Sequence, residues 1–257
     1  MQKTLKIAGL QADLTWHDPK KNTDHFSTII SGLDADLDLI VLPEMFATGF
    51  SMEPENIADQ GASLEWMKEQ AQKTDSAIAG SLMVEENNLY YNRFYFVTPE
   101  GIAQHYDKRH RFTLAGEHEV YERGKDLKII AYKGWKIALQ VCYDLRFPVF
   151  SRNIQDYDLL LYVANWPKTR VFAWDTLLKA RAIENMSYCV GINRVGTDDN
   201  GYDYDGHSGM YDSLGATLAF AEKREATLTA TLEADHLQET RKKLNFLADR
   251  DRFDLLE

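Results

Sequence analysis

The chain has 257 residues, of which 44% are hydrophobic and 12% aromatic, so it can bury a large core. Its formal net charge of -11 argues against nucleic acid or an anionic membrane as the main partner, because both would repel it. Two cysteines, Cys142 and Cys189, do not make a disulfide framework for this length, and no Cys/His cluster has the spacing of a zinc site.

The polarity of the N-terminus argues against a signal peptide, and no apolar run approaches the roughly 18 residues of a membrane helix. The sequence has no Pro/Gly/Ser-rich linker, low-complexity segment or clear repeat. We therefore expect a cytoplasmic protein with a single domain over residues 1–257. Its core is expected at about 4–235, followed by a closing helix at about 235–247.

The first half of the chain alternates apolar strands with helices. The predicted strands are continuous apolar runs over residues 5–12, 37–44 and 77–84. The predicted helices cover residues 22–35 and 61–74. Asn22 or Thr23 is a plausible cap for the first helix. A turn at Asn87-Asn88 should lead into an aromatic strand that ends near Pro99.

The second half continues this pattern. Buried strands are predicted over residues 135–144, 158–166 and 188–196, and hairpin strands over 207–221 and 225–233. A short helix is expected around 147–155, and a strong amphipathic helix over 171–186. The apolar stripe of the long helix consists of Trp174, Leu177, Leu178, Ala182 and Ile183. A mixed sheet with helices outside predicts a layered α/β sandwich.

Residues able to do chemistry stand where predicted strands end. Glu44 ends one buried run and Cys142 another, and ligands gather at the carboxyl ends of strands in open α/β sheets. Each also has an ordinary interpretation, a strand-loop junction for the acid and core packing for the thiol. Lys108 lies in a charged run that is typical of a solvated loop, and Glu117 and Glu119 follow shortly after it.

Three sequence blocks decide between these interpretations. LPEMFATGF (42–50), YDKRHRF (106–112) and CYDLRFP (142–148) resemble the catalytic blocks of the nitrilase, or carbon-nitrogen hydrolase, superfamily. NWP, ARAIEN and GINRVG match further along the chain, and the combination is most similar to the bacterial omega-amidases. The resemblance implies an α-β-β-α sandwich that dimerises across a helix surface.

The resemblance also implies roles for individual residues. Cys142 would be the nucleophile, Glu44 the general base and Lys108 the oxyanion partner. The backbone N–H of Tyr143 would be a second oxyanion donor. Such a site needs no metal and no organic cofactor.

A second glutamate often completes the site of this superfamily. Its spacing to Gly124 places it at Glu117, with Glu119 as the alternative. The implied reaction is hydrolysis of the side amide of 2-oxo acids such as 2-oxoglutaramate and 2-oxosuccinamate, through a thioester on the cysteine.

The carboxylate of such a substrate needs a cationic or N–H-rich clamp. Arg170, Arg146 and Arg194 are candidates by position, although an ion pair with Asp144 is the preferred interpretation of Arg146. Each of the three arginines could instead pair with a neighbouring acid.

Several other side chains have two interpretations. Trp166 and Phe46 could form walls of the pocket or fill core, and Arg181 could simply pair with Glu184 along its helix. Cys189 is interpreted as packing. The alternatives for the whole chain are another amidase of the superfamily, acting on N-carbamoyl amines or deaminated glutathione, and a non-catalytic ligand-binding dimer.

Overall fold

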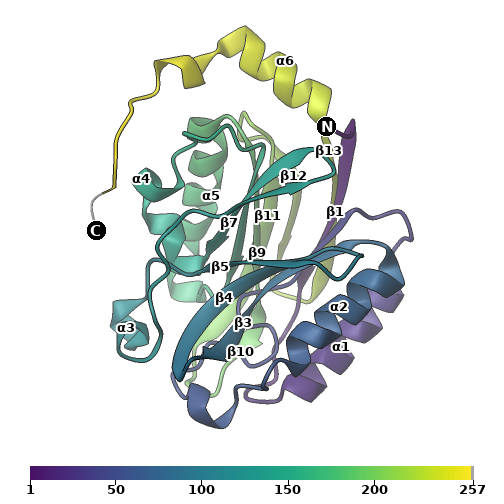
Figure 1. Cartoon of the computed structure of the whole chain (residues 1–257), viewed down its shortest axis with the longest axis vertical. Helices are drawn as coiled ribbons and strands as arrows, with labels where there is room; N and C mark the ends of the chain where they lie inside the picture. Colours follow the sequence, from purple (N-terminus) through teal and green to yellow (C-terminus); the bar gives the residue numbers. More distant parts are fainter. Residues whose placement is uncertain (256–257) are drawn as a thin grey trace.

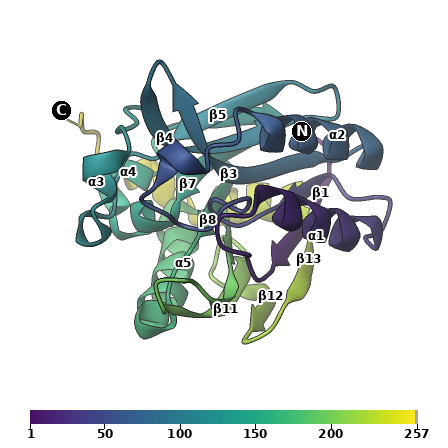
Figure 2. The ribbon, with the colours of Figure 1, turned by 90° about the horizontal axis from the view of Figure 1, so that it is seen from below.

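The computed structural model describes residues 1–255. Two β-sheets lie face to face, with helices on their outer faces (Figures 1 and 2). The first sheet has the order β13-β1-β2-β3-β4-β5, and the second has the order β10-β11-β9-β8-β7-β6 with β12 paired to β11. This is the α/β sandwich that the sequence predicts, and all its layers belong to a single domain.

The strands of the first sheet are β1 (Thr4–Gln11), β2 (Leu39–Val41), β3 (Ala77–Glu86), β4 (Leu89–Val97), β5 (Ala103–Asp107) and β13 (Ala226–Glu233). Those of the second are β6 (Ile129–Tyr132), β7 (Trp135–Val141), β8 (Leu159–Ala164), β9 (Tyr188–Asn193), β10 (Val195–Thr197), β11 (Asp203–Tyr211) and β12 (Thr217–Glu222). The helices are α1 (Pro19–Ser31), α2 (Ala62–Thr74), α3 (Glu117–Val120), α4 (Pro148–Ser151), α5 (Val171–Asn185) and α6 (Ala234–Leu244).

Strand alternation divides the apolar residues among three layers of core. In β2, Leu39 and Val41 face the space between the sheets, whereas Ile40 faces the helices. Leu159 and Leu161 of β8, in the opposite sheet, belong to the same core layer as Leu39 and Val41. Successive side chains of a strand point to opposite faces, so a continuous apolar run has both of its faces buried.

The outer layers are closed by helices. Phe26 of α1 and Met67 of α2 pack against the first sheet, while Trp174 and Leu178 of α5 pack against the second. The predicted stripe of α5 is wrong at Ile183, which is half exposed.

Buried Arg181 takes part of the inner face of α5 that the predicted stripe assigned to apolar residues. The Arg181 guanidinium donates to Glu184 at 2.9 Å and to the Leu145 carbonyl, so its charge has an acid partner inside the fold. The ion pair expected between Arg181 and Glu184 is therefore confirmed.

Helix α1 begins earlier than predicted. Pro19 occupies its first turn, and Asp18 caps it by accepting a hydrogen bond from the N–H of Lys21 at 2.9 Å. Asn22 and Thr23, the predicted caps, lie inside the helix. The buried Asn22 side chain donates to two carbonyl groups outside the helix, at 2.7 Å each.

The sequence pattern does not predict β5 or β6. Both are edge strands with one neighbour each, so only alternate residues such as Tyr106 and Ile130 are buried and no apolar run marks them. The strand predicted to run to residue 144 ends at Val141, where the chain turns into a 3-10 segment, η3 (Cys142–Arg146).

The predicted strands near the C-terminus fall into different sheets. β11 and β12 form the expected antiparallel pair. β13 instead pairs with β1 in the first sheet, with Thr4 opposite Glu233. The chain therefore crosses between the sheets near its end, and α6 lies at the end of the sandwich beyond β13 (Figure 1).

The two sheets repeat one arrangement that the sequence does not reveal. Each contains three adjacent parallel strands, β1-β2-β3 in one and β7-β8-β9 in the other, followed by an antiparallel neighbour. The chain segments that leave β2 and β8 are hydrogen-bonded to each other, which places the carboxyl ends of both sets at one edge of the sandwich.

Candidate active site

Three charged side chains meet where β2 and β5 end. Lys108 Nζ lies 2.9 Å from Glu44 Oε1 and 2.9 Å from Glu117 Oε2. All three are inaccessible to solvent, with exposed fractions of 1% for the lysine and 0% for each glutamate. Two carboxylates thus share one ammonium group in a buried cluster.

Backbone geometry explains why Lys108 is buried despite its charged neighbours. It directly follows β5, on the same face as buried Tyr106, so it points inward. Its N–H donates to the Asn92 carbonyl on β4, and its own carbonyl accepts from Gly124, each at 3.0 Å. A Cβ at Gly124 would lie 1.8 Å from the Asp107 oxygen, so only glycine permits this approach.

The expected second glutamate can be compared directly with its alternative. Glu117 begins α3 and points inward, where its Oε2 accepts from the N–H of Phe112 at 2.5 Å. Glu119 is exposed and lies 3.9 Å from His118. Of these two acids, Glu117 is the one that contacts Lys108.

Two asparagines for which the sequence predicts no role hold the acids in place. Asn92 Nδ2 donates to Glu44 Oε1 at 2.8 Å and to Glu117 Oε1 at 3.2 Å. The backbone N–H of Asn165 donates to Glu44 Oε2 at 2.7 Å. The available signal for Asn92 was a single amide within an aromatic strand, since a buried amide requires polar partners.

Cys142 lies next to this cluster at the start of η3. Its φ of +46° is in the left-handed region, which is uncommon for a residue other than glycine and costs about 1–3 kcal/mol. The residue as a whole is partly exposed, and its Sγ lies 3.9 Å from the Asn165 carbonyl oxygen. This conformation places a reactive atom between the buried charges and a cavity.

The surroundings raise the pKa values of Cys142, Glu117 and Lys108. Burial and the charge of Glu44 raise the pKa of the Cys142 thiol well above its ordinary value, and Lys108 only partly opposes them. Burial and the charge of Glu44 also raise the pKa of Glu117, against the effect of Lys108. The pKa of Lys108 is raised because its two carboxylates outweigh the cost of burying the ammonium. In the resting site the sulfur is therefore a neutral thiol and the lysine a cation.

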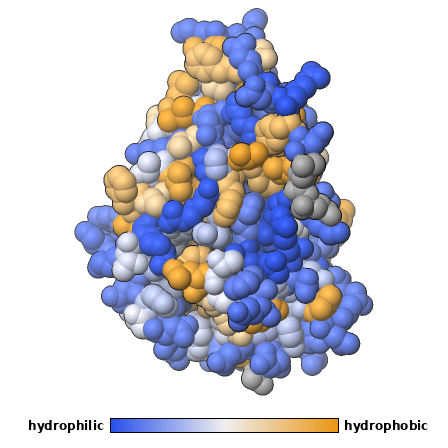
Figure 3. Space-filling view, turned by 90° about the vertical axis from the view of Figure 1, so that its left-hand side faces the viewer, coloured by the Kyte–Doolittle hydropathy of each residue, from blue (hydrophilic) through white to orange (hydrophobic). Residues whose placement is uncertain are grey.

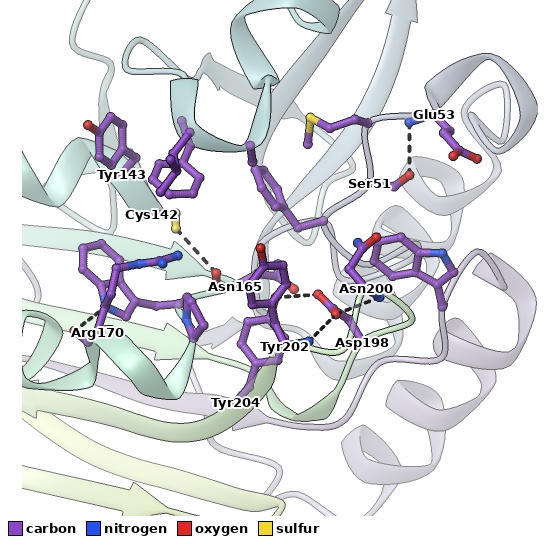
Figure 4. Close-up of a pocket in the computed structure, with 18 of the residues that line it drawn as sticks. Ser51, Glu53, Cys142, Tyr143, Asn165, Arg170, Asp198, Asn200, Tyr202 and Tyr204 are labelled. Atoms are coloured by element: carbon purple, nitrogen blue, oxygen red, sulfur yellow. Dashed lines mark hydrogen bonds between the residues drawn. The ribbon is translucent and has the colours of Figure 1, made fainter.

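A cavity of about 430 Å³ opens above Cys142. Its wall includes Tyr143, Arg170 and Tyr204 (Figure 4). Trp166 also lines it. This volume suits a small molecule, and Cys142, Tyr143 and Arg146 of η3 all line the cavity.

Two arginines line the cavity and stack on aromatic rings. The guanidinium of Arg146 lies 4.8 Å from the centre of the Trp166 ring, and that of Arg170 lies 5.0 Å from the centre of the Phe112 ring. Within residues 1–255 neither guanidinium forms an ion pair with an acid. The predicted pair of Arg146 with Asp144 is wrong, because that carboxylate is occupied by other donors.

Two predicted pocket residues lie elsewhere. Phe46 is fully buried in the core between the first sheet and its helices, where it packs against Phe26 and Trp66. Arg194 is also fully buried, and it donates to Asp13 at 2.8 Å. Neither lines the cavity, because the backbone directs both side chains into the interior of the fold.

The remaining predictions concern the second cysteine and metal ligands. Cys189 is buried in the core below α5, as its interpretation as packing predicts, and burial raises the pKa of its thiol. Among residues 1–255 no group of three or more His, Cys, Asp and Glu side chains is arranged to hold a metal ion. No helix in the described part of the chain is long and apolar enough to cross a membrane.

The family model for carbon-nitrogen hydrolases matches residues 6–242. Omega-amidase YafV of Yersinia enterocolitica is 48% identical over 255 residues, which cover 98% of this chain and 99% of the relative. A 2-oxoglutaramate amidase of Bacillus subtilis is 31% identical, over 95% of this chain and 96% of the relative.

A solved structure is also similar over its whole length. It is a CN-hydrolase superfamily protein from Xanthomonas campestris with an arsenic adduct in its active site. The TM-score is 0.96 at 40% identity, with coverage of 98% of this chain and 99% of the other.

Proposed function

The chain belongs to the carbon-nitrogen hydrolase family, and we propose that it is an omega-amidase whose nucleophile is Cys142. Its substrates would be 2-oxo acids with a distal amide, such as 2-oxoglutaramate and 2-oxosuccinamate, and its products the dicarboxylic acid and ammonia. One observation carries the assignment of the site: the Cys142 thiol lies between the buried Glu44-Lys108-Glu117 cluster and a small cavity. The same cavity is lined by two arginines that have no acid partner among the described residues.

The first step is attack of sulfur on the amide carbon. Because the raised thiol pKa keeps Cys142 protonated at rest, Glu44 accepts the proton as the carbon–sulfur bond forms. Hydrogen bonds from Asn92 and from the N–H of Asn165 orient the Glu44 carboxylate for this transfer. The carbonyl electron pair moves onto the amide oxygen, which becomes an oxyanion.

Two donors meet that oxyanion. Lys108 uses two of its N–H bonds on Glu44 and Glu117 and keeps a third for the substrate oxygen. The N–H of Tyr143 is the second donor, since it lies in the first turn of η3, where N–H groups lack partners within the helix. Removing one oxyanion donor typically costs on the order of 10²–10³ in rate.

Collapse of the tetrahedral intermediate breaks the carbon–nitrogen bond. The proton held by Glu44 passes to the leaving nitrogen, ammonia departs and a thioester remains on Cys142. Glu44 then takes a proton from a water molecule, which attacks the thioester carbon. The second intermediate expels the sulfur, the thiol regains its proton, and the acid leaves. Glu117 holds the Lys108 ammonium in place throughout.

The two cavity arginines support a substrate that carries a carboxylate. The substrate's carboxylate lies at the end opposite its amide, and a guanidinium that stacks on an aromatic ring keeps its N–H groups free to bind it. Arg170 over Phe112 and Arg146 beside Trp166 supply this clamp. Trp166 forms part of the wall.

We further propose a cytoplasmic homodimer. The helical side of the second sheet exposes large apolar side chains, among them Val149 of α4 and Phe172 and Ile183 of α5. Hydrophobic patches, coloured orange, are visible on the side of the molecule that carries α3 and α4 (Figure 3). Apolar patches of this kind are typical of interfaces. A reducing compartment would also keep Cys142 a thiol, as the reaction requires.

The test is release of ammonia from 2-oxoglutaramate and 2-oxosuccinamate, with N-carbamoyl compounds as comparison. Cys189→Ala is the matched control for Cys142→Ala, since Cys189 is buried away from the cavity. We expect turnover of the 2-oxo acids by the wild type and by Cys189→Ala, and none by Cys142→Ala. Turnover by Cys142→Ala would rule out the nucleophile. Turnover of N-carbamoyl compounds alone would leave the chemistry and rule out the substrate.

A further inference from the structure

Asp144 lies two residues after the cysteine and does not line the cavity. Its carboxylate is completely buried, and it accepts four hydrogen bonds from protein groups. Oδ1 accepts from the backbone N–H and from Nδ1 of His110, at 3.0 and 2.7 Å. Oδ2 accepts from the Tyr106 hydroxyl at 2.8 Å and from the N–H of Val141 at 2.9 Å. Every donor is neutral unless the histidine is protonated.

These donors flank the reacting groups on both sides. Val141 immediately precedes Cys142, and His110 lies two residues after Lys108. The Tyr106 hydroxyl that donates to Asp144 also accepts from the N–H of Arg109, at 3.0 Å. One carboxylate therefore connects the turn that presents the sulfur to the turn that presents the ammonium.

The histidine ring is held in one orientation. It stacks on Phe147 with 3.8 Å between ring centroids and an angle of 4° between the planes, and its edge contacts Phe150. Phe147 follows η3 directly, and its N–H donates to the Asp144 carbonyl. The link between the two turns thus consists of hydrogen bonds to the Asp144 carboxylate together with a stacked ring pair.

Such a link is needed because Cys142 is held at a φ of +46°, which persists only where the surroundings determine it. The hydrogen bond from Val141 to Asp144 fixes the residue before this strained position. The distance from the sulfur to the Lys108 ammonium depends on two chain segments from different sheets. Displacement of reacting groups by about 1 Å can cost about 10²-fold in rate.

We propose that Asp144, with His110 as its main partner, is a positioning residue that sets the geometry between the nucleophile and the oxyanion-binding lysine. It touches neither substrate nor the reacting atoms. The proposal rests on the catalytic roles assigned to Cys142 and Lys108, but it does not depend on which amide is the substrate.

A carboxylate with a purely structural role offers the matched control. Asp158 lies at the other end of the same strand pair, where its Oδ2 accepts from the N–H of Lys136 at 2.9 Å and its Oδ1 pairs with Arg241 at 3.0 Å. Asp158 thus resembles Asp144 in burial and in accepting an N–H of a residue in β7. It differs in having no contact with the site.

The experiment compares Asp144→Asn with Asp158→Asn. We measure kcat and KM for ammonia release, the rate of Cys142 alkylation by iodoacetamide, and thermal unfolding. Both variants should lower the unfolding temperature. Only Asp144→Asn should lower kcat, by about 10- to 100-fold with KM within about two-fold, and slow alkylation by a similar factor.

Smaller changes keep the test valid if Asp144→Asn does not fold. Tyr106→Phe removes one donor to Asp144, and Tyr132→Phe removes a hydroxyl that donates to the Asp38 carbonyl far from the site. We expect alkylation to slow about three- to ten-fold in Tyr106→Phe and not in Tyr132→Phe. His110→Asn, whose amide can replace the Nδ1 donor, should react faster than His110→Ala.

The outcomes separate this proposal from the proposed function. If the wild type hydrolyses no 2-oxo acid amide but its alkylation still depends on Asp144, the substrate is wrong and the positioning role stands. If folded Asp144→Asn retains kcat and alkylation within about two-fold of the wild type, the positioning role is overturned. Equal losses of activity in Asp144→Asn and Asp158→Asn would overturn it as well, because the effect would then be one of general stability.

Discussion

The two ends of the parallel strands use acidic residues for opposite purposes. At the amino end of β2, Asp38 accepts from the N–H of Lys6 at 2.8 Å and pairs with Lys133. At the carboxyl end of the same strand, Glu44 shares Lys108 with a second acid. Glu44 lies only six positions after Asp38 in the sequence.

The second sheet repeats the amino-end pattern. Asp158 precedes β8 as Asp38 precedes β2, and it accepts from a backbone N–H of β7 and pairs with Arg241. At these ends each acid has its own cation, and the cations Lys133 and Arg241 are partly exposed, at 34% and 20%. Such pairs tie segments together with little burial of unbalanced charge.

The carboxyl ends lack that balance. Two buried carboxylates share one buried ammonium, and a thiol with a raised pKa lies beside them. Isolated charges in the interior are costly, so this edge stores free energy that the amino ends do not. Acidic residues thus pair one to one with cations at the amino ends and share a single cation at the carboxyl ends, where we propose that they transfer protons.

Neutralising one acid at each end of β2 should have very different effects on activity. Glu44→Gln removes the proposed base, so kcat should fall by about 10³-fold or more, within the range of general acid–base catalysis. Asp38→Asn should lower stability and leave kcat within about two-fold. The measurements are steady-state ammonia release and urea unfolding. A folded Glu44→Gln variant with near wild-type kcat would contradict the proposed role of that residue.

Removing the shared cation should affect both activity and stability. Lys108→Met deletes the proposed oxyanion donor, and we expect kcat to fall by about 10²–10³-fold. It also leaves two buried carboxylates unpaired, so the free energy of unfolding should fall by about 3–5 kcal/mol.

Two variants sharpen the prediction for Lys108. Adding Glu117→Gln to Lys108→Met should restore part of the stability and none of the activity. Lys133→Met, at the amino end, should lower the free energy of unfolding by no more than about 1 kcal/mol and leave kcat intact. Recovery of activity in the double variant would show that Lys108 serves only to neutralise the acids.

The smallest effect concerns the pH dependence of stability. The folded protein raises the pKa of Glu117 above its ordinary value of 4.5, so the folded state binds the Glu117 proton more tightly than the unfolded state does. The resulting contribution of Glu117 to stability is fully present below pH 4.5 and is lost as the pH rises through the raised pKa. The unfolding free energy of the wild type minus that of Glu117→Gln should therefore decrease as pH rises from about 4.5.

Urea unfolding at a series of pH values checks this prediction for Glu117. Glu119→Gln is the control, since that exposed acid should give a nearly constant difference. An increase with pH for Glu117→Gln would mean that Lys108 dominates the environment of Glu117 and would reverse the assigned direction.

Much of the architecture could be predicted from sequence because burial on both faces leaves a local signature. The runs that became β2 and β8 are apolar at every position, and the turn at Asn87-Asn88 and helix α2 also lie where their patterns predict. Edge strand β5 has no such signature, so the sequence pattern of this segment was typical of a loop and indicated a solvent-exposed Lys108.

The roles proposed for Glu44, Lys108, Cys142 and Glu117 came from motif resemblance rather than from periodicity. For Phe46 and Arg194 the sequence left a pocket role and an ordinary structural role open, because position in the chain does not show which way a side chain points; the structure bears out the structural role of each. Arg146 was assigned to its sequence neighbour Asp144, although the structure pairs that carboxylate with a histidine more than thirty residues away.

By itself the sequence determined the alternation of strands and helices, the apolar faces and the family-specific blocks, since each depends on residues close together in the chain. Only the tertiary structure decided that Glu44 and Glu117 share Lys108, that Asn92 and Asn165 orient them, and that the arginines face the cavity. Those contacts join segments from both sheets, and the buried charges are stable only because packing excludes water and supplies each charged group with a partner.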